Sequence, residues 1–149
     1  MPIPATRIIT PVTAADFEQY YRLRYEVLRA PWHQPEGSEK AADDATATHA
    51  LMLNEHGVAL GVCRLHLQTP EEAQIRFMAI HPAYQGQGLG KELLQYLEDQ
   101  ARAQGARYIT LQARENALAF YRRCGYTVLA KTHLLFGEIQ HYQMRKDLI

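Results

Sequence analysis

The chain has 149 residues, 47% of them hydrophobic, which fits one ordinary globular domain over residues 1–149. Sixteen basic and sixteen acidic side chains cancel, so no overall field attracts nucleic acid or an anionic membrane surface. Two cysteines, no apolar leader and no apolar run near about 18 residues predict a protein of the reducing cytoplasm that does not enter membranes.

The first predicted element is a helix over residues 17–28, "FEQYYRLRYEVL", whose apolar residues recur at helical spacing. Thr13 and Asp16 precede it and offer N-cap chemistry. Arg24 falls within the apolar stripe, which leaves two interpretations open. Its charged end reaches back to water, or it anchors an anionic group of a substrate.

Residues 30–48 contain proline, glycine and clustered acidic side chains, which predict a long loop with a short helix and candidate substrate contacts. Residues 49–55 and 58–67 then read as a hairpin around His56 and Gly57. Arg64 and His66 share one face of this hairpin and are candidates for lining a cleft. A further strand, "AQIRFMAI", covers residues 73–80.

The next stretch, "QGQGLGKELLQYLEDQ", joins a glycine-rich loop directly to an amphipathic helix. Gly86, Gly88 and Gly90 allow positive φ and a close approach to the main chain. The first N–H groups of a helix have no intrahelical partner, and that end of its dipole is positive. The stretch therefore predicts an anion site, most naturally for a phosphate.

Two phosphate-loop patterns fail here. A P-loop requires glycine where Gln85 stands and serine or threonine where Glu92 stands. A dinucleotide fingerprint requires glycine in place of Lys91. These failures argue against a nucleotide-binding protein, while a glycine turn that only caps a helix stays open.

Beyond Gly105 the pattern predicts a strand over residues 108–113 and a short helix over residues 116–124. Asn116 is placed to cap this helix and Gly125 to end it. Residues 126–130 and 139–148 read as a final antiparallel pair of strands, joined across Phe136 and Gly137.

Two motifs resemble the GNAT superfamily of N-acetyltransferases. One is the loop of Gln85 to Gly90, and the other is "NALAFYRRCGY" at residues 116–126. The outer strings "RLRYEVLR" and "HYQMRKDL" are similar to the small bacterial branch of ElaA-like proteins. The resemblance implies an α/β (α+β) fold with a central mixed, mostly antiparallel sheet of about six to seven strands, flanked by about four helices.

The resemblance also implies acetyl-coenzyme A as cosubstrate, with its pyrophosphate in the glycine loop and its pantetheine arm along the strand before that loop. The cofactor contacts carried over in this way are Met78, Ile80, Gln85, Gly86, Gln87, Gly88, Leu89, Gly90, Lys91, Asn116 and Tyr121.

By resemblance, Tyr121 protonates the departing thiolate, since a phenol with a pKa of about 10 is protonated at neutral pH. The alternative is a tyrosine that only packs in the core. His141 matches a histidine of ElaA-like relatives and is the candidate general base. Arg76 stands where many relatives carry glutamate, which weakens any carboxylate base and leaves a chain of waters as the default.

The predicted activity is transfer of an acetyl group to a primary amine of a small molecule or protein, by direct attack on the thioester. The alternative is a catalytically silent acyl-CoA-binding module. Candidate substrate contacts are Arg24, Arg64, His66 and Arg76, and no metal-ligand spacing appears. The sequence selects no acceptor and no oligomeric state, although a homodimer is the commonest soluble assembly.

Overall fold

A computed structural model describes residues 5–149 of the chain. Its seven strands follow the order β1-β2-β3-β4-β5-β7-β6 in one sheet. The strands are β1 Thr6–Ile9, β2 Thr48–Asn54, β3 Ala59–Leu67, β4 Glu72–Ile80, β5 Tyr108–Arg114, β6 Thr127–Leu135 and β7 Ile139–Asp147. The α-helices are α1 Ala14–Leu28, α2 Leu89–Ala103 and α3 Leu118–Arg123, and the 3-10 helices are η1 Ala30–Trp32, η2 Asp44–Thr46, η3 Pro82–Tyr84 and η4 Glu115–Ala117.

The mixed, mostly antiparallel sheet confirms the predicted fold class. The residues described hold three α-helices rather than about four. The missing helix is the one expected within residues 30–48, where only the single turns η1 and η2 form. Pro31, Pro35 and Gly37 interrupt the backbone pattern that a longer helix needs.

The chain divides into two compact units. One contains the chain up to Leu65 together with Phe77–Leu97, and the other contains His66–Arg76 and Glu98–Ile149. A single domain over residues 1–149 stays a prediction.

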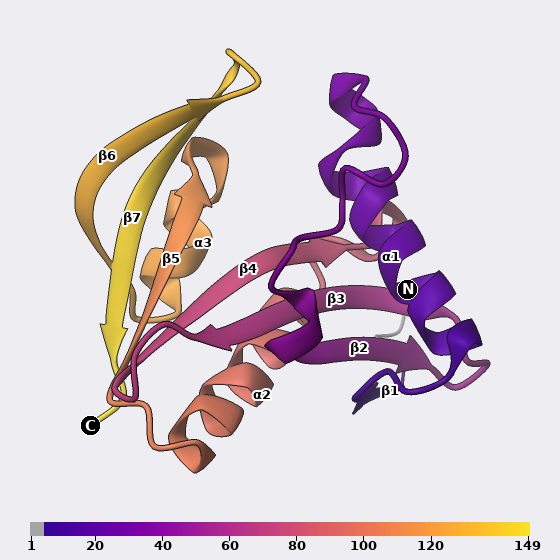
Figure 1. The fold of residues 1–149 in the computed structure, drawn as a ribbon, viewed down its shortest axis with the longest axis horizontal. Coiled ribbons are helices and arrows are strands. Elements are labelled where there is room, and N and C mark those ends of the chain that lie inside the picture. The colour runs from indigo at the N-terminus through magenta and orange to yellow at the C-terminus, as the bar shows by residue number, and fades with distance from the viewer. Residues whose placement is uncertain (1–4) are drawn as a thin grey trace. The chain divides into compact units, whose positions relative to one another are not determined.

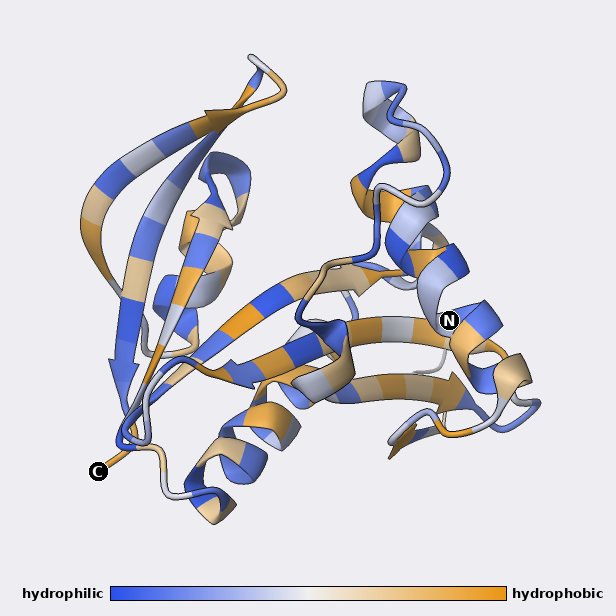
Figure 2. Cartoon of the chain, in the orientation of Figure 1, coloured by the Kyte–Doolittle hydropathy of each residue, from blue (hydrophilic) through white to orange (hydrophobic). Residues whose placement is uncertain are grey.

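In the first unit, β1 and β3 pair antiparallel with either side of β2. Thr13 and Asp16 form the predicted N-terminal cap of α1, each side chain bonding to the other's backbone N–H. Tyr20 and Leu23 of α1 pack in a core cluster with Leu51 and Val62 of the hairpin. Figure 2 shows β2 and β3 as mostly hydrophobic strands, as burial on both faces requires.

The glycine-rich segment also belongs to the first unit. Gly86 and Gly88 have left-handed φ values of 78° and 83°, and α2 begins at Leu89. Gly90 lies inside the first turn of α2, so the expectation of positive φ holds for two glycines and is wrong for the third.

In the second unit, Glu72–Ile75 pair in parallel with β5, and β7 lies between β5 and β6 in antiparallel pairing (Figure 1). Phe136 and Gly137 turn the β6–β7 hairpin with φ values of 54° and 70°. Gly125, at φ 96°, ends α3 as predicted. The prediction that Asn116 caps α3 is wrong, because Asn116 lies in η4 and the N-cap residue is Ala117.

Candidate active site

The loop between β4 and α2 presents main-chain donors. Glu92 donates to the carbonyl of Gly88 over 3.2 Å, which is the usual helical bond, while the N–H groups of the preceding turn have no intrahelical acceptor. The Gln85 side chain donates to the carbonyl of Ile80 over 3.1 Å and fixes the start of the loop. Leu89 is buried and anchors the helix, whereas Lys91 is exposed. These features suit an anion that approaches from solvent.

Apart from each glycine and its two chain neighbours, no atom of residues 5–149 lies within 4 Å of the position that a Cβ would take at Gly86 or Gly88. Packing therefore does not require glycine at either position. The positive φ does, and so would a ligand that approaches the main chain closely.

Met78 and Ile80, the predicted contacts of the pantetheine arm, are half-buried residues of β4. They follow Phe77, which has a φ of 59° inside a strand. A bulky residue in this conformation costs about 1–3 kcal/mol, so surrounding contacts must hold it. One such contact is the guanidinium of Arg24, 4.1 Å from the centre of the Phe77 ring.

Arg24 and Arg64 are both fully buried and share one carboxylate. Asp44 accepts from Nη1 of Arg24 at 3.0 Å and from Nη1 of Arg64 at 2.9 Å, and Asp43 pairs with Arg64 as well. Arg24 also donates to the carbonyl of Glu39 over 3.0 Å. The interpretation of Arg24 as a side chain reaching water is wrong, because its charge is balanced inside the protein.

These contacts join the loop of residues 30–48 to α1 and to the hairpin. Burial raises the pKa of Asp44, but the amide of Ala41 and the charge of Arg24 outweigh it and lower that pKa to about 2. The carboxylate is thus ionised at neutral pH. Direct substrate contact by Arg24 or Arg64 stays a prediction, and the ion pairs give both a structural role.

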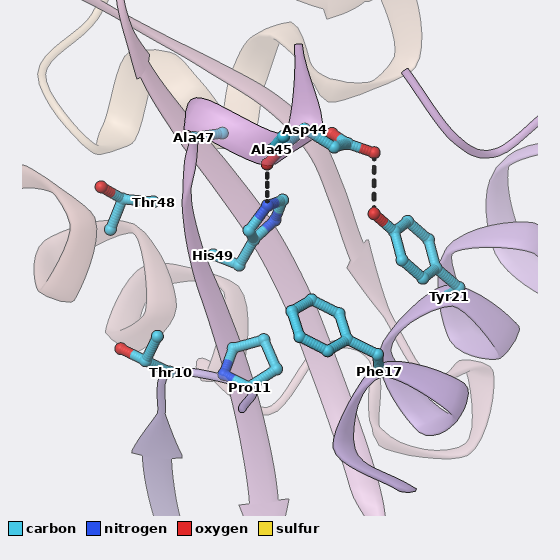
Figure 3. A pocket seen from close by; sticks show the side chains of 9 residues that line it. All are labelled: Thr10, Pro11, Phe17, Tyr21, Asp44, Ala45, Ala47, Thr48 and His49. Atoms are coloured by element: carbon cyan, nitrogen blue, oxygen red, sulfur yellow. Dashed lines mark hydrogen bonds between the residues drawn. The ribbon is translucent and has the colours of Figure 1, made fainter. Parts of the chain in front are cut away.

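A cavity of about 580 Å³ lies beside this network, between α1 and the loop (Figure 3). Its lining is formed by Thr10, Pro11, Phe17, Tyr21, Asp44, Ala45, Ala47, Thr48 and His49. His49 donates from Nε2 to the carbonyl of Asp44 over 2.7 Å, so its Nδ1 accepts from the hydroxyl of Tyr20, also at 2.7 Å. Sequence reasoning missed His49, although it alternates with Leu51 and Leu53 on a buried face.

In the second unit, Tyr121 is 8% exposed on α3, and the ring of Tyr126 meets it edge-on with the centroids 5.8 Å apart. The amide of Tyr126 donates to the carbonyl of Tyr121 over 3.0 Å, which closes the end of the helix. Asn116 is exposed in the turn before α3. Tyr121 is therefore held firmly, as either a core residue or a proton donor needs to be.

His141 of β7 is 7% exposed and has a defined tautomer. Its Nδ1 donates to the carbonyl of Ile139 over 2.9 Å. Burial lowers the pKa of His141 against the effect of that carbonyl, and Arg114, its register partner on β5, lowers it further. A neutral imidazole with a lone pair on Nε2 is suited to accept a proton.

The remaining candidates lie on the second unit's part of β3 and β4. His66 accepts at Nδ1 from Gln68 over 3.2 Å, and Gln68 also donates to Gln74. Arg76 is exposed. Within residues 5–149 no group of three or more His, Cys, Asp or Glu side chains is placed to hold a metal ion. Nor does this part of the chain contain a helix with the length and apolarity needed to cross a membrane.

Comparison with known proteins decides the family. Residues 16–126 match the sequence model of the acetyltransferase (GNAT) family. The chain belongs to the GNAT acetyltransferases. The predicted superfamily is thereby confirmed, and with it acetyl-coenzyme A as the acetyl donor that the family uses.

Among relatives of this GNAT protein, the [ribosomal protein bS18]-alanine N-acetyltransferase of Haemophilus influenzae is 30% identical over 122 residues, which cover 80% of each chain. The N-alpha-acetyltransferase RimI of Mycobacterium tuberculosis is 34% identical over 90 residues, or 58% of this chain and 56% of RimI. The match thus spans about half of that relative's length. Escherichia coli ElaA shares the fold, with a TM-score of 0.76 at 16% identity over 96% of this chain and 99% of ElaA.

Proposed function

We propose that this GNAT protein transfers an acetyl group from acetyl-coenzyme A to a primary amine of a small molecule or a protein. The observation that carries the proposal is the loop in which Gly86 and Gly88 take left-handed conformations directly before α2. This backbone, together with the unused N–H groups of the first turn, suits the pyrophosphate of coenzyme A. Lys91, exposed in that turn, adds a positive charge.

The remaining cofactor contacts are assigned by the family pattern. Met78 and Ile80 offer main-chain groups of β4 to the pantetheine arm, and Gln85 to Lys91 surround the phosphates. Asn116 is exposed, so its side chain is accessible to a ligand.

For the chemistry, we assign Tyr121 as proton donor to the thiolate and His141 as acceptor of the amine proton. The amine lone pair forms the new N–C bond while the C–S pair leaves on sulfur. Burial and the fixed tautomer of His141 support its assignment, because both favour the neutral imidazole. A chain of waters is the alternative route for the same proton.

The names of two relatives indicate which amines to test first as acceptors. Two relatives carry names that specify acetylation of an α-amine, in one case that of an alanine of a ribosomal protein. Peptides with an N-terminal alanine therefore belong in the first amine panel, beside polyamines and amino sugars.

Calorimetric titration of acetyl-coenzyme A, with ATP as control ligand, tests the cofactor assignment. We expect micromolar binding of acetyl-coenzyme A, no binding of ATP, and at least about tenfold weaker acetyl-coenzyme A binding by Gly88→Ala. Gly57→Ala is the matched control, since Gly57 has a φ of 76° and equally open surroundings in the β2–β3 turn. If both variants lose the same amount of acetyl-coenzyme A affinity, backbone strain explains the loss and a direct contact of the cofactor with Gly88 does not.

Amine-dependent release of coenzyme A tests the transfer itself. Release with at least one amine class supports the proposal. Tight acetyl-coenzyme A binding with no release across the panel would instead identify a silent binding module.

A further inference from the structure

Two imidazole rings stack on one another in the β6–β7 hairpin. The ring centroids of His133 and His141 are 4.4 Å apart, and the ring planes differ by 14°. His133 is exposed on β6, while His141 is 7% exposed on β7. The outer ring therefore covers the inner one on the side of β6.

One side chain, that of Gln140, ties together the backbone at both histidines. The side-chain amide of Gln140 donates to the carbonyl of His141 over 3.0 Å and to that of His133 over 3.3 Å. Next to this pair, the register sets Leu134 opposite Gln140 and Leu135 opposite Ile139. His133 lies where the β6–β7 register shifts, between Lys131 and Leu134, so the Gln140 side chain is what ties its backbone to that of His141.

The inner ring can accept a proton at one atom only. Nδ1 of His141 already donates to Ile139 over 2.9 Å, which leaves the lone pair on Nε2. Within the part of the chain that the structure describes, no protein group bonds to that Nε2.

Charged and titratable groups on every neighbouring element bear on His141. Arg114 of β5 is its register partner, and His133 of β6 stacks on it. Glu115 of η4 accepts from the hydroxyl of Tyr142, at the long distance of 3.5 Å, and is exposed. Arg114 thus opposes a positive charge on the His141 ring at close range, and the stacked ring of His133 covers that ring from β6.

We propose that His133 is a positioning residue for His141, whose stacked ring keeps the inner imidazole neutral and aims its Nε2 at the attacking amine. The proposal rests on the proposed acetyl transfer. As the amine nitrogen bonds to the acetyl carbon and the C–S bond breaks, Nε2 takes the proton that the amine loses. The thiolate takes its proton from Tyr121, which solvent then reprotonates.

Three variants separate the ring from the charge. His133→Phe keeps a flat ring that cannot be charged, His133→Lys keeps a charge without a flat ring, and His133→Ala removes both. Leu134→Ala is the matched control for general loosening of β6, since Leu134 is 54% exposed beside His133.

The first readout is NMR titration of the His141 ring protons in the full chain. We expect His133→Ala to raise the midpoint by about 0.5 pH unit or more, because water then covers more of the inner ring. His133→Phe should stay within about 0.2 unit of the wild type, since the ring still covers His141. An unchanged midpoint in His133→Ala, or a shift in Leu134→Ala equal to it, would overturn the proposal.

The second readout is the pH profile of kcat/KM. His133→Ala and His133→Lys should lose about tenfold or more, with the acid limb following the His141 midpoint, and His133→Phe should retain most of the activity. In a His141→Ala background the same changes should have no further effect, and an additive loss would contradict the positioning role. The NMR titration needs no turnover. It therefore tests the effect of the His133 ring on His141 even if no amine in the panel is acetylated.

Discussion

The hydroxyl group of Tyr126 donates a hydrogen bond of 2.9 Å to the buried carboxylate of Glu98. The ammonium of Lys146 reaches the other oxygen of that carboxylate at 3.0 Å and the carbonyl of Cys124 at 2.9 Å. One buried acid of α2 thereby ties together the end of α3 and strand β7. The helix that carries Tyr121 is fixed by this contact at its C-terminal end.

Replacing Tyr126 with phenylalanine should lower the free energy of unfolding by about 1–3 kcal/mol, because the buried Glu98 loses one of its donors. Urea denaturation at pH 7 measures the change. Tyr142→Phe is the control, since its hydroxyl makes only a 3.5 Å contact with exposed Glu115, and it should cost under about 0.5 kcal/mol. Similar losses in both variants would contradict a special role for the Glu98 contact.

Asp44→Asn should be more damaging, with a loss of about 3–5 kcal/mol, because it leaves the charges of Arg24 and Arg64 buried beside a neutral amide. Asp43→Asn should cost less, since the side chain of Asp43 is 40% exposed and Arg64 keeps Asp44 as a partner. Urea denaturation measures the loss of unfolding free energy in both variants. A larger loss in Asp43→Asn than in Asp44→Asn would contradict a central role for Asp44 in the network.

Stability should also fall on mild acidification through His49. Burial lowers the pKa of His49, so the folded state binds this proton less readily than the unfolded chain does. The free energy of unfolding therefore decreases as the pH drops below about 6.5, the pKa of a histidine in the unfolded chain. Comparing unfolding free energies at pH 7.5 and 5.5 should show a smaller drop in His49→Gln than in the wild type.

The control for this comparison is His56→Gln, because His56 is exposed in the β2–β3 turn. Its pH dependence should match that of the wild type. If the unfolding free energy of His49→Gln falls with pH as steeply as that of the wild type, a group other than His49 is responsible for the acid sensitivity.

Tyr121→Phe should lower kcat by about 10²- to 10⁴-fold, as loss of a general acid does, while acetyl-coenzyme A binds with an affinity within about twofold of the wild type. Stopped-flow or thiol-release kinetics with a responsive amine, paired with calorimetry, measure both quantities. Tyr96→Phe on α2 is the control and should leave both unchanged. A normal kcat in a folded Tyr121→Phe protein would make Tyr121 a core residue only.

Local signals in the sequence predicted much of this fold. The Thr13 and Asp16 cap, the hairpin around Gly57 and the start of α2 within the glycine run each depend on neighbouring residues. Strand β1 was missed because four residues, "TRII", are too few to show a period.

The long-range contacts of the candidate site could not be predicted from such local signals. Nothing local predicts that Asp44 meets both Arg24 and Arg64, since those partners are each 20 positions away along the chain. The stack of His133 on His141 depends on the register that the Phe136–Gly137 turn imposes, and the turn length has to be known before the two histidines can be paired. The assignment of Asn116 as a cap failed because a 3-10 turn precedes α3 and moves the helix start by two residues.

The shared carboxylate of Asp44 also determines which positions of the loop of residues 30–48 can change without loss of the ion pairs. Lifting residues 39–44 would take both Asp43 and Asp44 away from Arg24 and Arg64, and the described network offers these two buried cations no other carboxylate. The ion pairs therefore hold the inner edge of the loop. Exposed positions such as Glu36 and Ala42 take no part in these ion pairs. Substitutions at these outward positions can therefore change the surface chemistry of the loop while the ion pairs of Asp44 keep its inner edge in place.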